Sequence, residues 1–369
     1  MENATKRHLV ISAVNIRKGG TLTVLRDCLR YLSSQDGFRV TALVHDRSLC
    51  DYPGIEYIVI PWSTKSWLHR LWCEYHTMGK ISKQLAPVDL WFSLHDTTPR
   101  VEASRQAVYC HNSFPLLTIS WKDFKMNYKI PLFSLLSKYA YRFNVNKNNY
   151  LVVQQEWMRV ALSYLIPFPA QKIIVSPPAF LQPVLEDRSK KEPIPIFIYP
   201  AIPDVHKNIE TLCFASRLIE FRLGKGRFRT LITVDGSENK YARWLRTRFG
   251  QVPSIEFCGH LDQKELFSYY ERAACLVFPS RVETWGLPIS EFLPTGKPMI
   301  LADRPYARET AAGASSVAFF LYNDAYTLSL RMQDVIEGRT HAFSSVRPRH
   351  PKAPYAQDWQ QLFQMLINQ

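Results

Sequence analysis

The residues best suited to chemistry are two glutamates in the run FPSRVETWGLPISEFLPTGKPMI, Glu283 and Glu291, with seven residues between them. The run predicts a strand ending at Ser280, a turn and then a helix. The residues of the turn are Gly286, Leu287 and Pro288. Free N–H groups and the helix dipole at such a helix start favour a diphosphate. Glu291, about one turn into the helix, is placed to bind a ribose diol, and Glu283 to reach sugar hydroxyls.

Short apolar runs that alternate with helix-length segments must position these residues. From HLVISAV to NYLVVQQ the alternation predicts a parallel sheet covered by helices on both faces, and it restarts at IPIFIYPA. The Pro-rich stretch from Pro177 to Pro195 indicates a linker. We therefore expect an α/β protein with two doubly wound, Rossmann-like domains, residues 1–180 and 190–354. A closing helix at 355–369 is expected to pack back on the first domain.

Composition limits the class of protein. The 369 residues are 46% hydrophobic and 21% charged, as expected for two globular domains. No stretch approaches the roughly 20 apolar residues of a membrane span, and the first residues lack a signal-peptide pattern, so we expect a cytoplasmic protein. The seven cysteines are scattered singly, without metal-ligand spacing, and are predicted to be reduced thiols.

The run with the two glutamates resembles family 4 of the retaining glycosyltransferases, in which Glu, seven residues and a second Glu follow a Pro-Ser strand end. The family's Gly-Lys-Pro is present as Gly296, Lys297 and Pro298. The segment IEFCGHLDQKELFSYYERAACLVFPS also resembles the family's strand, glycine loop and helix beside the base. The resemblance implies a GT-B fold, a nucleotide-diphosphate sugar as donor, and retention of anomeric configuration without an essential metal. No Asp-x-Asp pair offers itself for a divalent ion, so we expect no metal and no cofactor.

Without a metal, the leaving diphosphate needs protein cations and backbone dipoles. The resemblance implies that Lys207, just before a helix in IYPAIPDVHKNIETL, binds it. The family usually has Gly-Arg at the end of the preceding strand, where this chain has Pro200 and Ala201. The second cation therefore stays open, and its candidates by position are Arg281, Arg17 and Lys18.

The resemblance also implies two ligand-binding positions in the first domain. Gly19 and Gly20, after the first strand, resemble a glycine loop beside donor and acceptor, where glycine permits positive φ and close backbone approach. His111 follows the strand QAVYC, where the family carries a histidine near the donor sugar. Strand ends of open α/β sheets bind ligands. We expect His111 to hydrogen-bond the sugar and to stabilise positive character at the anomeric carbon through its ring or its backbone carbonyl.

The net charge of +14 predicts an anionic partner, which could be nucleic acid, acidic lipid or a phosphorylated substrate. Residues Met1 to Phe180 carry 22 Lys plus Arg against 12 Asp plus Glu. Two segments there mix aromatic and basic residues, as interfacial helices do, although their apolar faces could equally pack on the sheet. We expect contact with an anionic membrane surface. The residues concerned are Trp67, Trp72, Trp121, Tyr128 and Tyr139 among Lys65, Arg70, Lys122, Lys125, Lys129 and Lys138.

We therefore predict a retaining glycosyltransferase that adds a sugar to a glycan or lipid-linked acceptor of O-antigen, lipopolysaccharide or capsule synthesis, in the cytoplasm or peripherally on the inner face of the plasma membrane. One alternative is another GT-B enzyme, such as a sugar-nucleotide epimerase. The other is a basic nucleic-acid-binding module, although no RNP, zinc-finger or helix-turn-helix pattern is present. The expected catalytic residues are His111, Lys207 and Glu283, and the donor-binding residues are Gly19, Gly20, Gly286, Leu287, Pro288 and Glu291.

Overall fold

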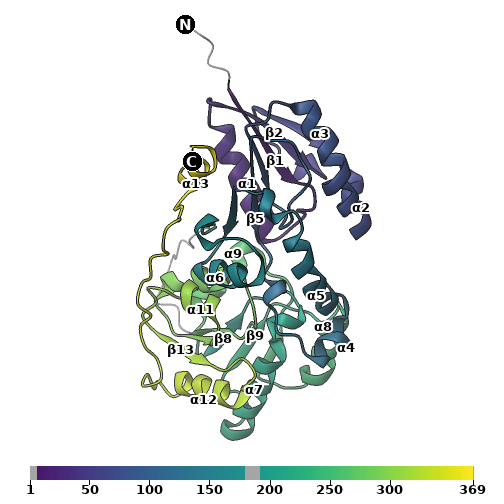
Figure 1. Cartoon of the computed structure of the whole chain (residues 1–369). Helices are drawn as coiled ribbons and strands as arrows, with labels where there is room; N and C mark the ends of the chain where they lie inside the picture. The colour runs from purple at the N-terminus through teal and green to yellow at the C-terminus, as the bar shows by residue number, and fades with distance from the viewer. Residues whose placement is uncertain (1–5, 179–191, 369) are drawn as a thin grey trace. The chain divides into compact units, whose positions relative to one another are not determined.

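The computed structural model describes residues 6–178 and 192–368, which fall into two compact units (Figure 1). Most of the predicted linker lies outside the described residues. The first unit comprises Met1–Pro115, Leu135–Ala179 and Pro351–Gln369, and the second comprises Leu116–Ser134 and Phe180–His350.

The first unit is built on a seven-stranded sheet in the order β3-β2-β1-β4-β5-β6-β7, with every neighbouring pair parallel. Its strands are β1 (Arg7–Ala13), β2 (Phe38–Val44), β3 (Ile55–Val59), β4 (Leu90–Ser93), β5 (Arg105–Cys110), β6 (Tyr150–Val153) and β7 (Ile173–Val175). The connecting helices include α1 (Gly20–Ser33), α2 (Trp67–Trp72), α3 (Met78–Leu85) and α6 (Glu156–Leu165). The central strands are buried along almost their whole length, as expected where helices cover both faces of a parallel sheet.

The second unit has a six-stranded parallel sheet in the order β10-β9-β8-β11-β12-β13. Its strands are β8 (Ile196–Tyr199), β9 (Arg229–Ile232), β10 (Ile255–Phe257), β11 (Cys275–Phe278), β12 (Met299–Ala302) and β13 (Val317–Phe320). Its helices include α7 (Ile209–Leu223), α8 (Lys240–Phe249), α9 (Gln263–Arg272), α10 (Leu287–Phe292), α11 (Pro305–Thr310) and α12 (Ala325–Ile336). Two doubly wound parallel sheets confirm the predicted α/β fold class.

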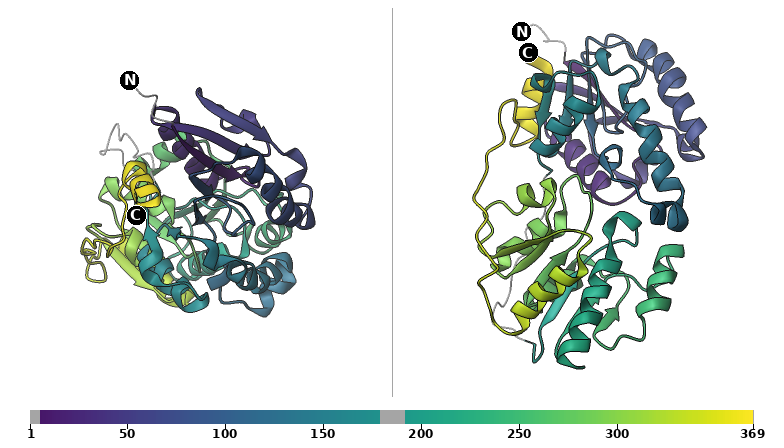
Figure 2. Two further views of the ribbon diagram at one scale, coloured as in Figure 1. Left: turned by 45° about the horizontal axis from the view of Figure 1, so that its top comes forward. Right: turned by 60° about the horizontal axis from the view of Figure 1, so that its bottom comes forward.

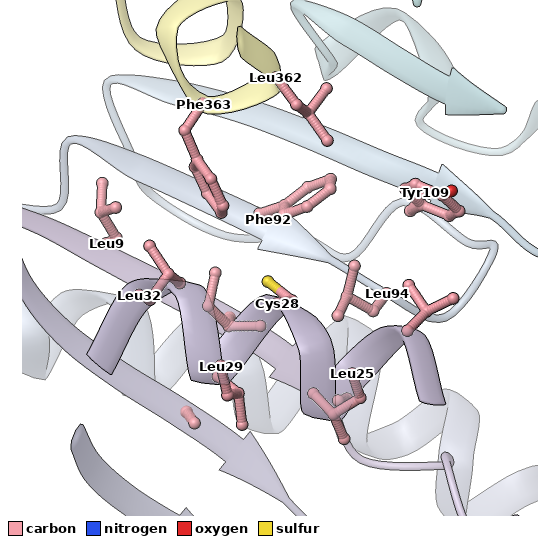
Figure 3. Close-up of a cluster of buried hydrophobic side chains, with 14 of the residues drawn as sticks. Leu9, Leu25, Cys28, Leu29, Leu32, Phe92, Leu94, Tyr109, Leu362 and Phe363 are labelled. Carbon is pink, nitrogen blue, oxygen red and sulfur yellow. The ribbon is translucent and has the colours of Figure 1, made fainter. Parts of the chain in front are cut away.

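The last helix, α13 (Trp359–Asn368), packs on the first unit although it ends the chain (Figures 1 and 2). Its Phe363 lies against Phe92 of β4 and Tyr31 of α1, with ring centroids 5.9 Å away in both cases. Figure 3 shows Leu362 and Phe363 pointing into the same apolar cluster as the leucines of α1. The last helix therefore completes a hydrophobic core that also contains residues of β1 and α1.

One segment of the first half of the chain, Leu116–Ser134, belongs to the second unit, and we call it the strap. It contains α4 (Trp121–Asn127) and the beginning of α5 (Lys129–Arg142). Lys122 forms an ion pair with Glu210 of α7, and Asp123 forms one with Arg281. The sequence-based boundary placed the strap in the first domain, but these long-range ion pairs, which local patterning does not reveal, hold it to the second unit.

We expect Phe363→Ala to lower the free energy of unfolding by about 3–5 kcal/mol, because it removes a buried aromatic ring and leaves a cavity. Denaturant unfolding of the purified protein measures the loss. Gln364→Ala is the matched control, because Gln364 is exposed on the same helix and should change stability by less than about 0.5 kcal/mol. Equal effects of the two substitutions would contradict this packing.

Candidate active site

In the second sheet the strand order reverses between β8 and β11, which is the position at which open α/β sheets bind ligands. Lys207 ends a short helical turn, Val205–Lys207, after β8, and Glu283 lies in the loop after β11. Lys207 Nζ lies 2.6 Å from Glu283 Oε1, and the two side chains are only 16% and 14% exposed. Two residues predicted from separate runs of sequence thus form one ion pair at the sheet edge.

Neighbouring residues fix both partners of this pair. Ser280 Oγ donates a hydrogen bond of 2.6 Å to the same oxygen of Glu283 that Lys207 contacts. Asn208, with φ 57°, donates its side-chain amide to the backbone oxygen of Pro279 at 3.0 Å, which ties the Lys207 turn to the end of β11. Because two donors share Oε1, the other carboxylate oxygen keeps its acceptor capacity. Ser280 and Asn208 were missed as site residues in the sequence analysis, although each adjoins a residue that it assigned.

The second glutamate lies in α10, which begins after Gly286. Gly286 has φ 89°, and a Cβ there would come within 3.3 Å of Ile289 Cδ1, so the turn requires glycine. Tyr270 of α9 donates a hydrogen bond of 3.0 Å to Glu291 Oε2. Burial raises the pKa of Glu291, and the hydrogen bond from Tyr270 only partly opposes this. The carboxylate is thus oriented from α9 before any ligand binds.

Lys297, in the Gly-Lys-Pro run, stabilises the carboxyl end of α9, the helix next to Glu291. Lys297 Nζ donates to the backbone oxygens of Ala273 at 2.9 Å and Tyr270 at 3.4 Å, and also to that of Glu271. A cation at the carboxyl end of a helix satisfies free carbonyls and interacts favourably with the helix dipole. Lys297 therefore fastens the end of α9, the helix whose Tyr270 orients Glu291.

In the first unit, Gly19 precedes α1 with φ 72°, and its backbone oxygen accepts from Leu22 and Thr23 in the first turn. A Cβ at Gly19 would meet no atom within 4 Å, so its conformation and not crowding favours glycine. Gly20 is the first residue of α1. The two glycines thus form an exposed helix start at the end of the loop that follows β1.

His111 follows β5 and is 8% exposed, with its ring stacked on Tyr109 at a centroid distance of 4.2 Å. Burial, with a smaller contribution from His95, lowers the pKa of His111 to about 3, so the ring is neutral near pH 7. Neither ring nitrogen has a hydrogen-bond partner among the described residues. A neutral imidazole can donate one hydrogen bond and accept another.

Asp96 fixes the turn that carries His111, and the sequence analysis did not identify it. Its carboxylate accepts a hydrogen bond of 2.6 Å from the backbone N–H of His111, and its own φ is 71°, which is uncommon outside glycine. Burial raises the pKa of Asp96 against the opposing effect of Arg70. The available signal was its position just after a buried strand, in LHD.

The candidates for a second cation lie in different units. Arg17 and Lys18 are exposed in the first unit, where Arg17 donates to the backbone oxygen of Thr64. Arg281 shares the second unit with Lys207, but both of its terminal nitrogens bind Asp123, at 2.6 and 3.1 Å. A cavity of about 350 Å³ lies beside Arg281, between the strap, the first turn of α7 and the loop after β13.

Residues 6–178 and 192–368 contain no cluster of three or more His, Cys, Asp or Glu that could ligate a metal. No helix in this part of the chain has the length and apolar character needed to cross a bilayer. All seven cysteines are free thiols.

Several solved structures share this fold. HepE of Anabaena in complex with UDP-glucose is 13% identical, with 98% of this chain and 95% of that chain covered and a TM-score of 0.63. WaaG, a glycosyltransferase involved in lipopolysaccharide biosynthesis, is 12% identical, with 89% and 92% covered and a TM-score of 0.63. Sucrose-phosphate synthase from Thermosynechococcus elongatus is 14% identical, with 90% of each chain covered and a TM-score of 0.61. No curated protein matches the sequence.

Two parallel α/β units of this kind define the GT-B fold, as the sequence analysis predicted, and the family match over residues 186–345 supports a glycosyltransferase. Residues 186–345 match the family described as Glycosyl transferases group 1. The second unit therefore carries the domain of that family, and the Lys207–Glu283 pair and Glu291 all lie within it.

We expect Glu291→Gln to stabilise the ligand-free protein near neutral pH, with little effect at low pH. Because the folded pKa of Glu291 is raised, the wild type loses stability as pH rises through that value, whereas glutamine does not ionise and still accepts from Tyr270. Unfolding free energies measured from about pH 4 to about pH 7 should show a growing advantage of the variant. Glu102→Gln, at an exposed side chain, is the control and should show no such trend.

Proposed function

We propose that the protein is a retaining glycosyltransferase that moves a sugar from a nucleotide-diphosphate donor to a glycan or lipid-linked acceptor in the synthesis of O-antigen, lipopolysaccharide or capsule. The observation that carries this proposal is the Lys207–Glu283 pair on the same sheet edge as the oriented Glu291. Together they offer a cation for the diphosphate, a carboxylate for sugar hydroxyls and one for the ribose. The UDP-glucose bound to HepE supports the donor class, and the role of WaaG supports the acceptor class.

In this mechanism Lys207 exchanges partners during the reaction. In the free protein Glu283 neutralises it, and a bound diphosphate offers it a second anion. As the bond from the anomeric carbon to the diphosphate oxygen breaks, negative charge grows on that oxygen and Lys207 stabilises it. The acceptor oxygen bonds to the anomeric carbon on the same face, and its proton passes to the departing diphosphate oxygen. This scheme requires no metal ion, and activity should persist in a chelator.

His111 has a complementary role in this proposal. Its ring is neutral near pH 7 because burial lowers its pKa to about 3. A neutral ring can hydrogen-bond a sugar hydroxyl without placing a cation beside an anomeric carbon that is itself becoming positive. The unpartnered ring nitrogens provide the capacity for this contact.

A panel of nucleotide-sugars and nucleoside diphosphates, screened by thermal shift, tests the proposal, because a ligand that binds the folded state raises its unfolding temperature. A donor should stabilise the protein without added metal. Products formed from that donor without an acceptor distinguish an epimerase. Tight, steeply salt-dependent binding to nucleic acid without any nucleotide-sugar affinity would support the nucleic-acid-binding alternative.

The two glutamates should respond differently to substitution. Glu291→Ala should weaken binding of donor and nucleoside diphosphate together, because the ribose is common to both. Glu283→Ala should leave nucleoside diphosphate binding intact or tighter, since Lys207 loses its competing partner, while turnover falls. Calorimetry and steady-state kinetics measure both effects. Equal losses of nucleotide affinity in the two variants would show that the roles are wrongly assigned.

Lys207→Ala should cost about 2–4 kcal/mol of transition-state stabilisation, measured as kcat/KM, because one preorganised cation is lost. Near-normal kcat/KM would mean that another group holds the leaving diphosphate. Lys225→Ala is a suitable control, because it removes an exposed lysine from the same unit.

We further propose that the acceptor is met at an anionic membrane surface. Helices α4 and α5 and the residue between them, Tyr128, expose large aromatic side chains, with Trp121 89%, Tyr139 70% and Tyr128 62% exposed. Lys125 and Lys129 are exposed among them. Exposed rings beside cations suit the headgroup region of a membrane with acidic lipids.

Two basic residues of the predicted membrane-binding segments do not support this role. Arg70 of α2 binds Glu74, and Lys122 binds Glu210. Both are held in ion pairs of the protein itself and are not free for lipid. The charge of these residues in the sequence did not reveal that each pairs with a glutamate of the protein.

Lys125→Gln combined with Lys129→Gln should weaken sedimentation with anionic vesicles, because each lysine near such a surface contributes about 1 kcal/mol. Lys225→Gln combined with Lys264→Gln removes the same charge from exposed positions in the second unit and should leave sedimentation unchanged. If wild-type protein does not sediment with anionic vesicles at low salt, the membrane proposal fails. The glycosyltransferase fold and site do not depend on it.

A further inference from the structure

The carboxylate of Asp123, in the strap, binds both the first turn of its own helix and the side chain of Arg281. Its carboxylate accepts from the backbone N–H of Ser120 at 2.7 Å, which begins α4, and it accepts two hydrogen bonds from Arg281, at 2.6 and 3.1 Å. The Asp123 side chain is 1% exposed and that of Arg281 11%. An unpaired charge is costly where water is excluded. The α4 segment that carries Asp123 therefore cannot move away from the loop that carries Arg281 without leaving a buried charge unpaired or exposing it to water.

Arg281 belongs to the loop that carries Glu283. Its backbone N–H donates to the oxygen of His206 at 2.8 Å, and its own backbone oxygen accepts from Arg304 Nε at 2.9 Å. His206 directly precedes Lys207. The backbone of Arg281 is therefore hydrogen-bonded to the turn that carries Lys207, and Arg281 itself lies two residues before Glu283.

The strap has a second anchor that does not touch this loop. Lys122 pairs with Glu210 of α7, and its ammonium group lies 4.7 Å from the ring centroid of Trp244 in α8. This anchor holds the strap to the second unit as the Asp123 pair does, but among the described residues it makes no hydrogen bond or ion pair with Ser280–Glu283. Substituting one anchor at a time can therefore distinguish loss of strap docking from loss of order in the Glu283 loop.

We propose that Asp123 is a positioning residue for Glu283. By holding Arg281, it fixes the loop from Ser280 to Glu283 against the turn of Lys207, so that the ion pair forms with its observed geometry. This inference rests on the proposed function of Glu283 and assigns Asp123 no contact with substrate.

The test compares Asp123→Asn with Lys122→Met. Asparagine keeps the size of Asp123 and an acceptor for Ser120 but removes the charge that binds Arg281, while Lys122→Met removes only the second anchor. Hydrogen exchange of the backbone amides of Arg281–Glu283 should accelerate about tenfold or more in Asp123→Asn and change less than about threefold in Lys122→Met.

Kinetics on the nucleotide-sugar that binds best in the panel supply the second measurement. Asp123→Asn should lower kcat on the order of tenfold while KM and nucleoside diphosphate affinity stay within about twofold, because a displaced catalytic group slows the chemistry more than it weakens binding. Asp123→Glu, which restores a carboxylate, should recover part of kcat. Arg281→Lys tests the same contact from the other side and serves if Asp123→Asn does not fold.

Unchanged exchange of Arg281–Glu283 in Asp123→Asn, or equal acceleration in Lys122→Met, would overturn the proposal, because Asp123 would then only dock the strap. A fall in nucleotide affinity as large as the fall in kcat would also overturn it. If wild-type protein binds no nucleotide-sugar, the proposed function fails, while hydrogen exchange still decides whether Asp123 orders the loop.

Discussion

The ion pair between Lys207 and Glu283 is the interaction around which the second unit's site is organised. It forms because parallel strands end at one edge of the sheet and the strand order reverses between β8 and β11, leaving room where their loops diverge. Both side chains are mostly buried, so each needs the other while no ligand is bound. A pair that neutralises itself in the free protein can later offer a cation and a carboxylate separately to a ligand.

Glu291 and His111 are each held by an element other than their own. Tyr270 of α9 holds Glu291 of α10, and Lys297 in turn fastens the end of α9. In the first unit Asp96, after β4, holds the backbone of His111, after β5. Such support reduces the conformational freedom that a side chain would otherwise lose on binding, which is how a site is preorganised. It also makes the packing of helices on the sheets part of the chemistry.

Burial shifts the pKa values of two candidate site residues in opposite directions, and both shifts favour the neutral form. It lowers the pKa of His111, which favours a neutral ring, and raises the pKa of Glu291, which disfavours the carboxylate. Both follow from the same cost of placing a charge away from water. A glutamate kept partly desolvated binds hydroxyl donors strongly when ionised, because little water competes for its oxygens.

The sequence by itself determined the α/β class, the two doubly wound sheets and the residues that form the second unit's ion pair. Alternating apolar runs and the spacing of Glu283 and Glu291 are local patterns, which a single sequence displays directly. Only the tertiary structure decided that the strap belongs to the second unit and that Asp123 binds Arg281. These contacts join residues far apart in the chain, and charge or hydrophobicity at one position does not specify its distant partner. For the same reason Lys122, read as a membrane contact, faces Glu210 in the folded protein.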